Sequence, residues 1–203
     1  ADLNSAYAGV FAATPEQAQK LASKALEYAQ RAFCLQNSAA CPTLRLSFNE
    51  LQQLANNFSS SDIDYLYSLG ATWTGWIESN QSDWNAIAQI DRAKLLLSRV
   101  VELNDSYNHG FAHIYLGSLA TLVPPALGGK PAVAKNHFDR AIALSNGQNL
   151  MAQINYAQRY ARLLFDRQLH DQLVSQVLSA DANVEGLTLT NTLAKQLASQ
   201  LRS

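Results

Sequence analysis

Apolar residues recur three and four positions apart through most of the chain, which is the spacing of one buried helix face. Start and stop signals divide this pattern, beginning with Thr14-Pro15-Glu16-Gln17, where threonine caps a helix and proline opens it. Ser47-Phe48-Asn49-Glu50 is a second capping box, and Gly147 closes the helix that Pro131 opens. The pattern predicts an all-α fold of about ten helices, mostly in antiparallel pairs with short links.

The expected pairs cover about residues 2–36, 62–103, 106–146 and 149–179, with an insert at 37–61 and a capping helix at about 188–201. Within them, one helix is expected from Ser82-Asp83 to about Leu103. Another is expected to start at Asp105 or Asn108 and to end before Pro124, because proline cannot continue a helix. We expect one helical-repeat domain over 1–203.

Three of the pairs repeat one pattern. The first helices carry Leu66-x-x-Leu69-Gly70-x-x-Trp73, His113-x-x-Leu116-Gly117-x-x-Ala120 and Gln153-x-x-Tyr156-Ala157-x-x-Tyr160. The second helices carry Ala93-x3-Leu97, Ala134-x3-Phe138 and Leu169-x3-Leu173. Tetratricopeptide repeats typically carry a small residue that lets the paired helix approach, beside a large residue that fills the gap. The sequence therefore predicts a tetratricopeptide-like α-solenoid of antiparallel helix pairs.

The amino-acid composition favours helices and argues against some functions. The chain has 31 Ala and 30 Leu, both strong helix formers, and a net charge of -1. That charge removes the broad attraction on which non-specific binding to nucleic acid or anionic membranes depends. The longest uncharged stretch, 106–129, is interrupted by His109, His113 and the pair Pro124-Pro125, which leaves a length that suits a buried helix better than a membrane span.

The two cysteines, Cys34 and Cys41, stand at the end of a helical pattern and just before Pro42. A disulfide between them would close a loop of 8 residues, worth roughly 2.5 kcal/mol on the chain-entropy model. It would imply an oxidising compartment such as the bacterial periplasm. Two free thiols are the alternative, while the spacing of a metal site is absent.

Other candidate chemistry is weak. His109 and His113 are spaced to share a helix face, but both are expected on the packing side and no third metal ligand accompanies them. His137 and His170 are expected on second helices without partners nearby. Leu127-Gly128-Gly129-Lys130 lacks the spacing of a phosphate loop and is expected to be a rigid turn. We expect neither cofactor nor metal, and no enzymatic activity.

The first helices of a tetratricopeptide array line a concave face that binds partners. Helical geometry places Trp73 and Trp76 on the packing side of their helix, as core residues. The opposite face is expected to carry the candidate ligand- or partner-binding residues Asp64, Tyr67, Thr74, Phe111, Ile114, Ser118, Leu122, Met151, Ile154, Gln158, Arg162 and Phe165. Such a groove suits a segment of a partner protein, or a hydrophobic organic acid whose carboxylate meets Arg162. The alternative is that several of these residues simply pack against the next element.

One stretch is more specific than the repeats. Residues 116–131 read LGSLATLVPPALGGKP and are followed by AKNHFDRA at 134–141. The stretch resembles the TRAP-transporter-associated tetratricopeptide protein family, also called the T component. Residues 165–171, 186–191 and 25–29 and the Trp73/Trp76 helix look like this family too, so the resemblance covers nearly the whole chain.

The resemblance implies a periplasmic, usually lipid-anchored helical protein that is not an enzyme. It implies pairing with the extracytoplasmic substrate-binding protein of a TRAP-type uptake system. Two features depart from the family pattern: no lipidated cysteine stands at Ala1, and the first helix pair looks truncated. Whether a lipid anchor precedes Ala1 in the full-length protein stays open.

Two other functions stay open: a general tetratricopeptide scaffold for another cell-envelope assembly, and a helical protein that binds a small molecule or acts as a catalyst alone. The open ends of a short array favour self-association, so a homo-oligomer is a further expectation.

Overall fold

The structure is a computed structural model that describes residues 12–38, 41 and 45–202. All regular elements in these residues are helical, so the expected all-α class is confirmed. The chain divides into two compact units, Ala1–Asp105 and Ser106–Ser203, and each is described by itself. One domain over 1–203 stays a prediction, and the first helix of the pair expected at 2–36 falls largely outside the described residues.

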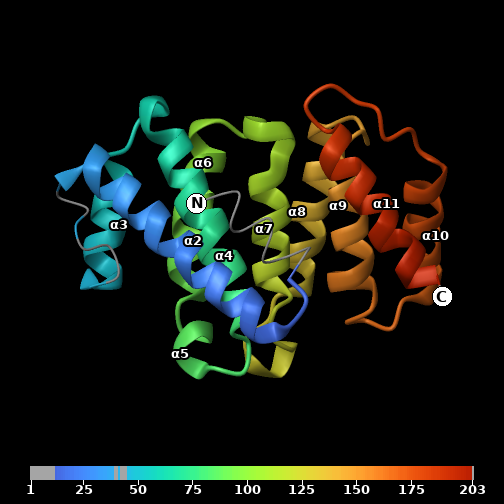
Figure 1. The fold of residues 1–203 in the computed structure, drawn as a ribbon, viewed down its shortest axis with the longest axis horizontal. Coiled ribbons are helices and arrows are strands. Elements are labelled where there is room, and N and C mark those ends of the chain that lie inside the picture. The colour runs from blue at the N-terminus through green and yellow to red at the C-terminus, as the bar shows by residue number, and fades with distance from the viewer. Residues whose placement is uncertain (1–11, 39–40, 42–44, 203) are drawn as a thin grey trace. The chain divides into compact units, whose positions relative to one another are not determined.

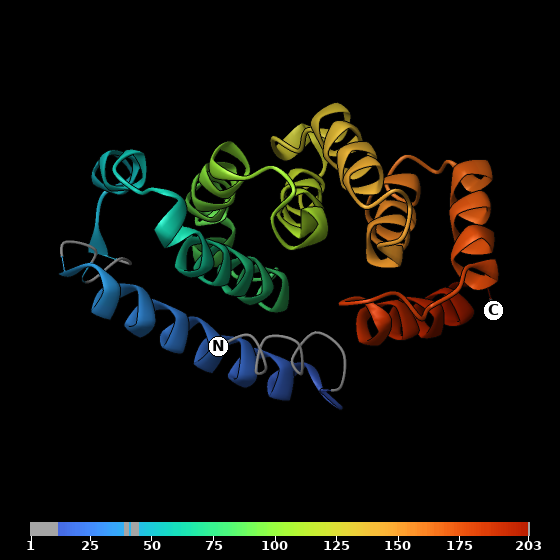
Figure 2. The same ribbon diagram turned by 90° about the horizontal axis from the view of Figure 1, so that it is seen from above.

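Unit 1 is built around one central helix. Its elements are α2 (Pro15–Gln36), α3 (Phe48–Asn56), the 3₁₀ turn η3 (Ser60–Asp62), α4 (Ile63–Ser79), α5 (Trp84–Ile87) and α6 (Ile90–Leu103). Helix α4 packs against both α2 and α6, and α3 packs against α6 (Figures 1 and 2). The sequence caps are confirmed: Thr14 accepts from the Gln17 amide, and Ser47 and Glu50 form a capping box.

Gly70 allows α4 and α6 to approach closely. A Cβ at Gly70 would lie 2.8 Å from Cγ of Leu97, so a larger residue would push the helices apart. Trp73, one turn on, is fully buried as expected, whereas Trp76 is only half-buried. The small and large positions of the first repeat therefore pack as the pattern predicts.

The helix expected from Ser82-Asp83 to Leu103 is wrong in one respect, because it is split. Asp83 caps only the short helix α5, and α6 starts at Ile90. The Asp83 side chain accepts from the Asn85 amide, which favours a short turn at this point. The long offset between the helices of this repeat is thus taken up by an extra helical turn.

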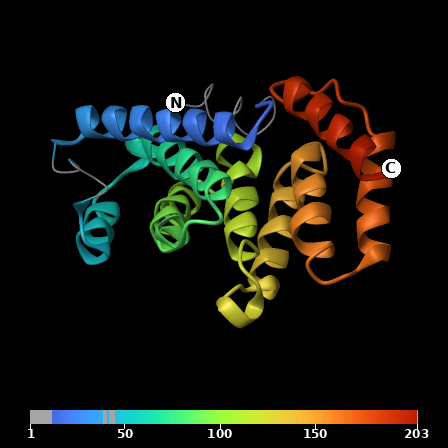
Figure 3. The same ribbon diagram turned by 60° about the horizontal axis from the view of Figure 1, so that its bottom comes forward.

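Unit 2 begins with a tight turn and continues as packed helices. Its elements are η4 (Tyr107–Gly110), α7 (Phe111–Ala120), η5 (Pro125–Leu127), α8 (Pro131–Leu144), α9 (Leu150–Asn155), the π-helix η6 (Tyr156–Ala161), α10 (Arg167–Ser179) and α11 (Thr188–Arg202). Helix α7 pairs with α8, η6 with α10, and α11 covers α9 and α10. The loop between α7 and α8, yellow in Figure 3, extends beyond the ends of both helices.

The α7–α8 pair repeats the packing seen in unit 1. A Cβ at Gly117 would lie 2.8 Å from Cζ of Phe138, and Phe138 is fully buried and stacked on Tyr156. The C-terminal helix α11 is held by Asn191, whose side chain accepts from the Leu150 amide and donates to the Gln148 carbonyl. This side chain satisfies backbone groups at the start of α9 that have no partner within the helix.

The start of α7 differs from the expectation of Asp105 or Asn108. Asn108 and His109 have φ angles of 47° and 54°, and Gly110 has 75°, so the chain is left-handed just before the helix. A right-handed helix cannot run through such residues, and α7 starts at Phe111. His109 is therefore exposed in the turn and does not lie on the packing side of a helix.

The structure joins Cys34 and Cys41 by a disulfide, with Cα atoms 5.1 Å apart. It links the end of α2 to the segment that leads into α3, in the insert expected at 37–61. Of the described helices, none has the length and apolar character needed to cross a membrane.

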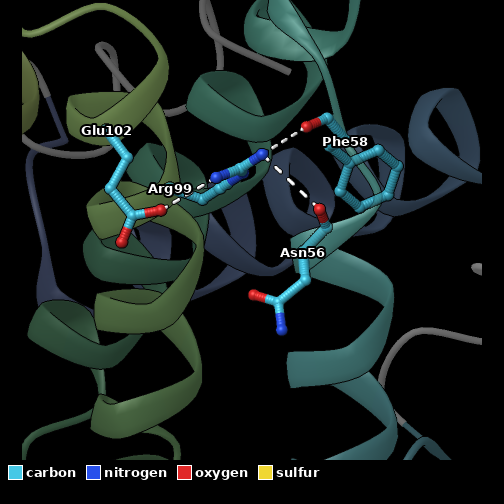
Figure 4. Close-up of polar contacts among 4 residues, drawn as sticks. All are labelled: Asn56, Phe58, Arg99 and Glu102. Atoms are coloured by element: carbon cyan, nitrogen blue, oxygen red, sulfur yellow. Dashed lines mark hydrogen bonds and ion pairs between the residues drawn. The ribbon is translucent and has the colours of Figure 1, made fainter.

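Arg99 ties α6 to the end of α3 in unit 1 (Figure 4). Its Nη2 donates to the carbonyl oxygens of Phe58 at 2.7 Å and Asn56 at 3.5 Å. Its Nη1 donates to Glu102 at 2.9 Å, one turn along α6. The positive guanidinium of Arg99 also lies near the C-terminus of α3, which is the negative end of the helix dipole. Arg99 therefore stabilises the packing of α3 against α6.

Candidate functional site

The twelve residues expected on a concave face differ widely in exposure. Asp64, Arg162 and Phe165 are exposed, and Tyr67, Phe111, Leu122, Met151 and Gln158 are half-buried. Thr74, Ile114, Ser118 and Ile154 are buried. They come from α4 in unit 1 and from α7, α9 and η6 and the segments that follow them in unit 2. A continuous face that joins them stays a prediction.

For the four buried residues, the expected exposure to a partner is wrong. Ile114 and Ile154 belong to the hydrophobic core of unit 2, with Phe111 and Met151 packed against it. The Thr74 hydroxyl donates to the Gly70 carbonyl within its own helix, at 2.8 Å. These four residues lie opposite the packing side of their repeat, and they are buried because each helix of a small unit has neighbours on more than one side. A helical wheel shows one helix alone and does not represent those neighbours.

Unit 2 contains two adjoining depressions on one side, which we call the arginine hollow. Together they are lined by Ala161, Arg162, Phe165, Asp166, Arg167, His170, Asp171, Val174, Ser175, Leu178, Ser179, Gln200, Leu201 and Arg202. The larger has a volume of about 820 Å³ and the smaller of about 580 Å³. The two share Arg167, His170 and Leu201, so they are continuous.

Helix α10 supplies half of the residues that line the hollow, and it does so from one face. Arg167, His170, Asp171, Val174 and Leu178 follow at helical spacing. Asp166 starts this helix by accepting a hydrogen bond from the Leu169 amide at 3.0 Å. The last turn of α11 closes the hollow on the other side, and Figure 2 shows the two helices next to each other, in orange and red.

The last residue of the π-helix η6 and the segment that follows it supply the remaining wall. The hydrogen bonds of η6 span five residues, as in the 3.2 Å bond from the Arg162 amide to the Ala157 carbonyl. Arg162 follows the π-helix directly, and Phe165 has a left-handed φ of 56° while its side chain is 93% exposed. A positive φ at a bulky residue is strained, and strained backbone tends to gather at functional sites.

Positive charge is in excess around the hollow. Arg167 lies 3.5 Å from Asp171, and His170 shares a hydrogen bond of 2.9 Å with the same carboxylate. The contact with His170, helped by Arg167, lowers the pKa of Asp171 below its ordinary value. Arg162 and Arg202 form no ion pair within the described residues.

Apolar side chains form part of the hollow floor. Of the residues that line it, Val174 is buried, and Leu178 and Leu201 are half-buried. A carboxylate can accept two parallel hydrogen bonds from one arginine, and an apolar tail can cover the exposed aliphatic surface. The arrangement therefore suits a ligand with one acidic end and one apolar end.

Of the predicted site residues, Arg162 and Phe165 meet in the hollow. Sequence reasoning missed Arg167, His170, Leu201 and Arg202, although the spacing of Arg167, His170 and Val174 on one helix face was visible. The approach of α11 to α10 was not visible, because no local pattern specifies which helices pack together.

Histidines form a pair that the sequence did not predict. Nδ1 of His113 lies 2.8 Å from Nδ1 of His137, joining α7 to α8, so the expectation that His137 lacks a partner is wrong. His109 takes no part, because it precedes the start of α7. In the described part of the chain, no group of three or more His, Cys, Asp or Glu side chains is placed to hold a metal ion.

Comparison with known protein families identifies a family for this chain. The family model described as TAtT, the TRAP transporter T-component, matches residues 1–203. No curated protein matches the chain. The family match confirms the resemblance carried by residues 116–131 and by the shorter segments around it.

Proposed function

Because the chain belongs to the TRAP transporter T-component family, we propose that it is a periplasmic accessory protein that docks the extracytoplasmic substrate-binding protein of its uptake system. Membership itself implies an accessory role in TRAP transport, and this family of transporter components is not a known enzyme family. The match over 1–203 is the observation that carries the proposal.

Features of the described residues support it. A disulfide joins Cys34 and Cys41, which suits an oxidising compartment such as the periplasm. The α4–α6 and α7–α8 pairs have the close glycine contacts of tetratricopeptide hairpins, a class of repeat that presents binding surfaces to other proteins.

The arginine hollow adds a ligand to this proposal. We propose that it holds a hydrophobic organic acid, with the carboxylate at Arg162 and the apolar part against Phe165 and Leu201. Arg162 has no competing ion pair within the described residues, so its guanidinium is available to an incoming anion. The ligand would then be held by the accessory protein while the substrate-binding protein is docked.

The docking proposal is tested by titrating the purified chain with the substrate-binding protein of the same TRAP system, using isothermal titration calorimetry. Saturable one-to-one binding supports docking, and no binding in the micromolar range contradicts it. If another envelope protein is captured while the substrate-binding protein is not, the general scaffold function is favoured instead.

The ligand proposal is tested separately, by titrating medium-chain fatty acids and aromatic acids into the wild type and Arg162→Ala. Loss of a charge-assisted hydrogen bond is expected to weaken binding about tenfold or more. Arg31→Ala removes an exposed arginine from α2 in unit 1 and serves as the matched control. Equal affinity of all three proteins, with unchanged melting temperatures, would place the acid elsewhere.

A further inference from the structure

Exposed large apolar side chains concentrate at a second place in unit 2, away from the arginine hollow. We define the proline loop as residues 124–130, which connect α7 to α8. Leu127 in this loop is 59% exposed, and Val133 in the first turn of α8 is 42% exposed. The neighbouring residues Pro124, Pro125 and Ala126 are exposed as well. Apolar surface gathered in one segment is typical of an interaction site.

The proline loop is held in one conformation by its own backbone. The Pro124 carbonyl accepts from the amides of Leu127 at 2.9 Å and Gly129 at 3.1 Å. The Lys130 amide donates to the Ala120 carbonyl at 2.7 Å, which fastens the loop to the end of α7. A Cβ at Gly129 would collide with the Val123 carbonyl oxygen, so only glycine allows this close return.

This rigidity has a consequence for binding. Two prolines fix φ, and four loop hydrogen bonds, including one of 3.1 Å from the Gly128 amide to the Pro125 carbonyl, are already formed before any partner arrives. Leu127 is therefore presented to solvent without the entropy cost of ordering a flexible loop on binding. An exposed leucine on a preorganised turn is suited to insertion into a pocket.

The charges near the loop indicate the chemistry of that pocket. Lys130 is exposed at the end of the loop, and residues 106–138 contain no Asp or Glu. Lys135 is already paired with Asp139 at 2.6 Å. A carboxylate on a partner would meet Lys130 without repulsion from the segment itself, whereas a second copy of the loop would bring two Lys130 side chains together. One lysine is also too few to hold the loop on an anionic membrane.

We propose that the proline loop docks into an apolar pocket rimmed by carboxylates on the substrate-binding protein, with Leu127 inside the pocket and Lys130 at its rim. This proposal rests on the proposed function and names the surface that performs it. The loop lies outside the residues that line the arginine hollow, so docking and ligand binding use different surfaces of unit 2.

The test compares affinities for the purified substrate-binding protein among the wild type, Leu127→Ser, Lys130→Glu and Leu189→Ser. Leu189 is 81% exposed near the start of α11 and is the matched control, because it is a leucine of similar exposure outside the loop. We expect Leu127→Ser to weaken binding at least tenfold and Leu189→Ser to change it less than twofold. Lys130→Glu should weaken binding and remove part of its salt dependence.

Each outcome has one meaning. Absence of binding by the wild type contradicts the proposed function itself. Wild-type binding with equal affinity for Leu127→Ser and Leu189→Ser overturns the loop proposal and leaves docking intact. Self-association of the wild type that Leu127→Ser abolishes also overturns it, because the loop would then join two copies. Thermal melts and acid titrations of Leu127→Ser, both expected to match the wild type, check that the fold and the hollow are unchanged.

Discussion

The contact between Gly117 and Phe138 allows a quantitative test of how the helix pairs are packed. Replacing Gly117 by alanine adds one Cβ, which would lie 2.8, 2.9 and 3.0 Å from three atoms of the Phe138 ring. Favourable carbon contacts lie at about 3.5–4.0 Å. The ring would have to retreat by about 0.5–1 Å, but it is fully buried and stacked on Tyr156 with ring centroids 5.2 Å apart.

Two opposing effects set the magnitude of the change. Forcing an extra carbon into a packed core costs about 1–3 kcal/mol. Alanine in place of glycine stabilises a helix by about 1 kcal/mol. Gly117→Ala should therefore lower the free energy of unfolding by about 1 kcal/mol, within a range of about 0–2 kcal/mol.

A double-mutant cycle separates the two effects. Phe138→Leu removes the ring and by itself costs roughly 1–2 kcal/mol through lost packing. In the double variant the added Cβ no longer meets the ring, so alanine keeps its helical advantage without the collision. We expect a favourable coupling between Gly117→Ala and Phe138→Leu of about 1–3 kcal/mol, equal to the relieved overpacking.

The assay is urea unfolding followed by circular dichroism, with midpoints compared at constant slope. A Gly117→Ala variant more stable than the wild type, or a coupling within about 0.3 kcal/mol of zero, would show that α7 and α8 do not approach as closely as described. Gly70→Ala should also be destabilising, because its Cβ would lie 2.8 Å from Cγ and 3.0 Å from Cδ2 of Leu97, which is fully buried.

Two further predictions concern other contacts. Arg99→Ala should lower the free energy of unfolding by about 1.5–3 kcal/mol, since it leaves the carbonyls of Asn56, at the end of α3, and Phe58, just after it, without a charged donor. Glu102→Ala should cost less than about 1 kcal/mol. Urea midpoints measure both costs, and equal costs would contradict the role given to Arg99. Burial raises the pKa of Tyr156 to about 12, so its neutral form is favoured in the folded state, and the resulting stability is complete below pH 10 and lost as the pH rises through about 12. Melting temperatures between pH 9 and 12 should therefore fall less steeply for Tyr156→Phe than for the wild type, and parallel curves would refute the assignment.

Local signals in the sequence were reliable where the structure depends on neighbouring residues. The caps at Thr14 and Ser47, the proline at the start of α8 and the closure at Gly147 all form as expected. They succeed because each cap is a contact between residues at most five positions apart, which the chain makes wherever the rest of the protein goes.

The predicted helix boundaries were wrong where several weak conformational preferences of the residues compete. The split between α5 and α6 follows the Asp83 cap, which closes only a short helix. The later start of α7 required Asn108 and His109 to adopt φ angles that their residue types permit but do not demand. The π-helix at Tyr156–Ala161 is a similar case, because its residues are ordinary helix formers. Its wider turn carries no local signature in the sequence.

The sequence by itself determined the helical class, the pairing of helices around Gly70 and Gly117, and the family, because each depends on spacing along the chain. Tertiary structure alone decided which residues are available to a ligand or partner. It buried Ile114 and Ile154, joined His113 to His137, and brought Arg202 of the last helix toward Arg167. The reason is physical: burial and charge proximity depend on which helices pack together, and that choice is made by long-range contacts that no single segment encodes.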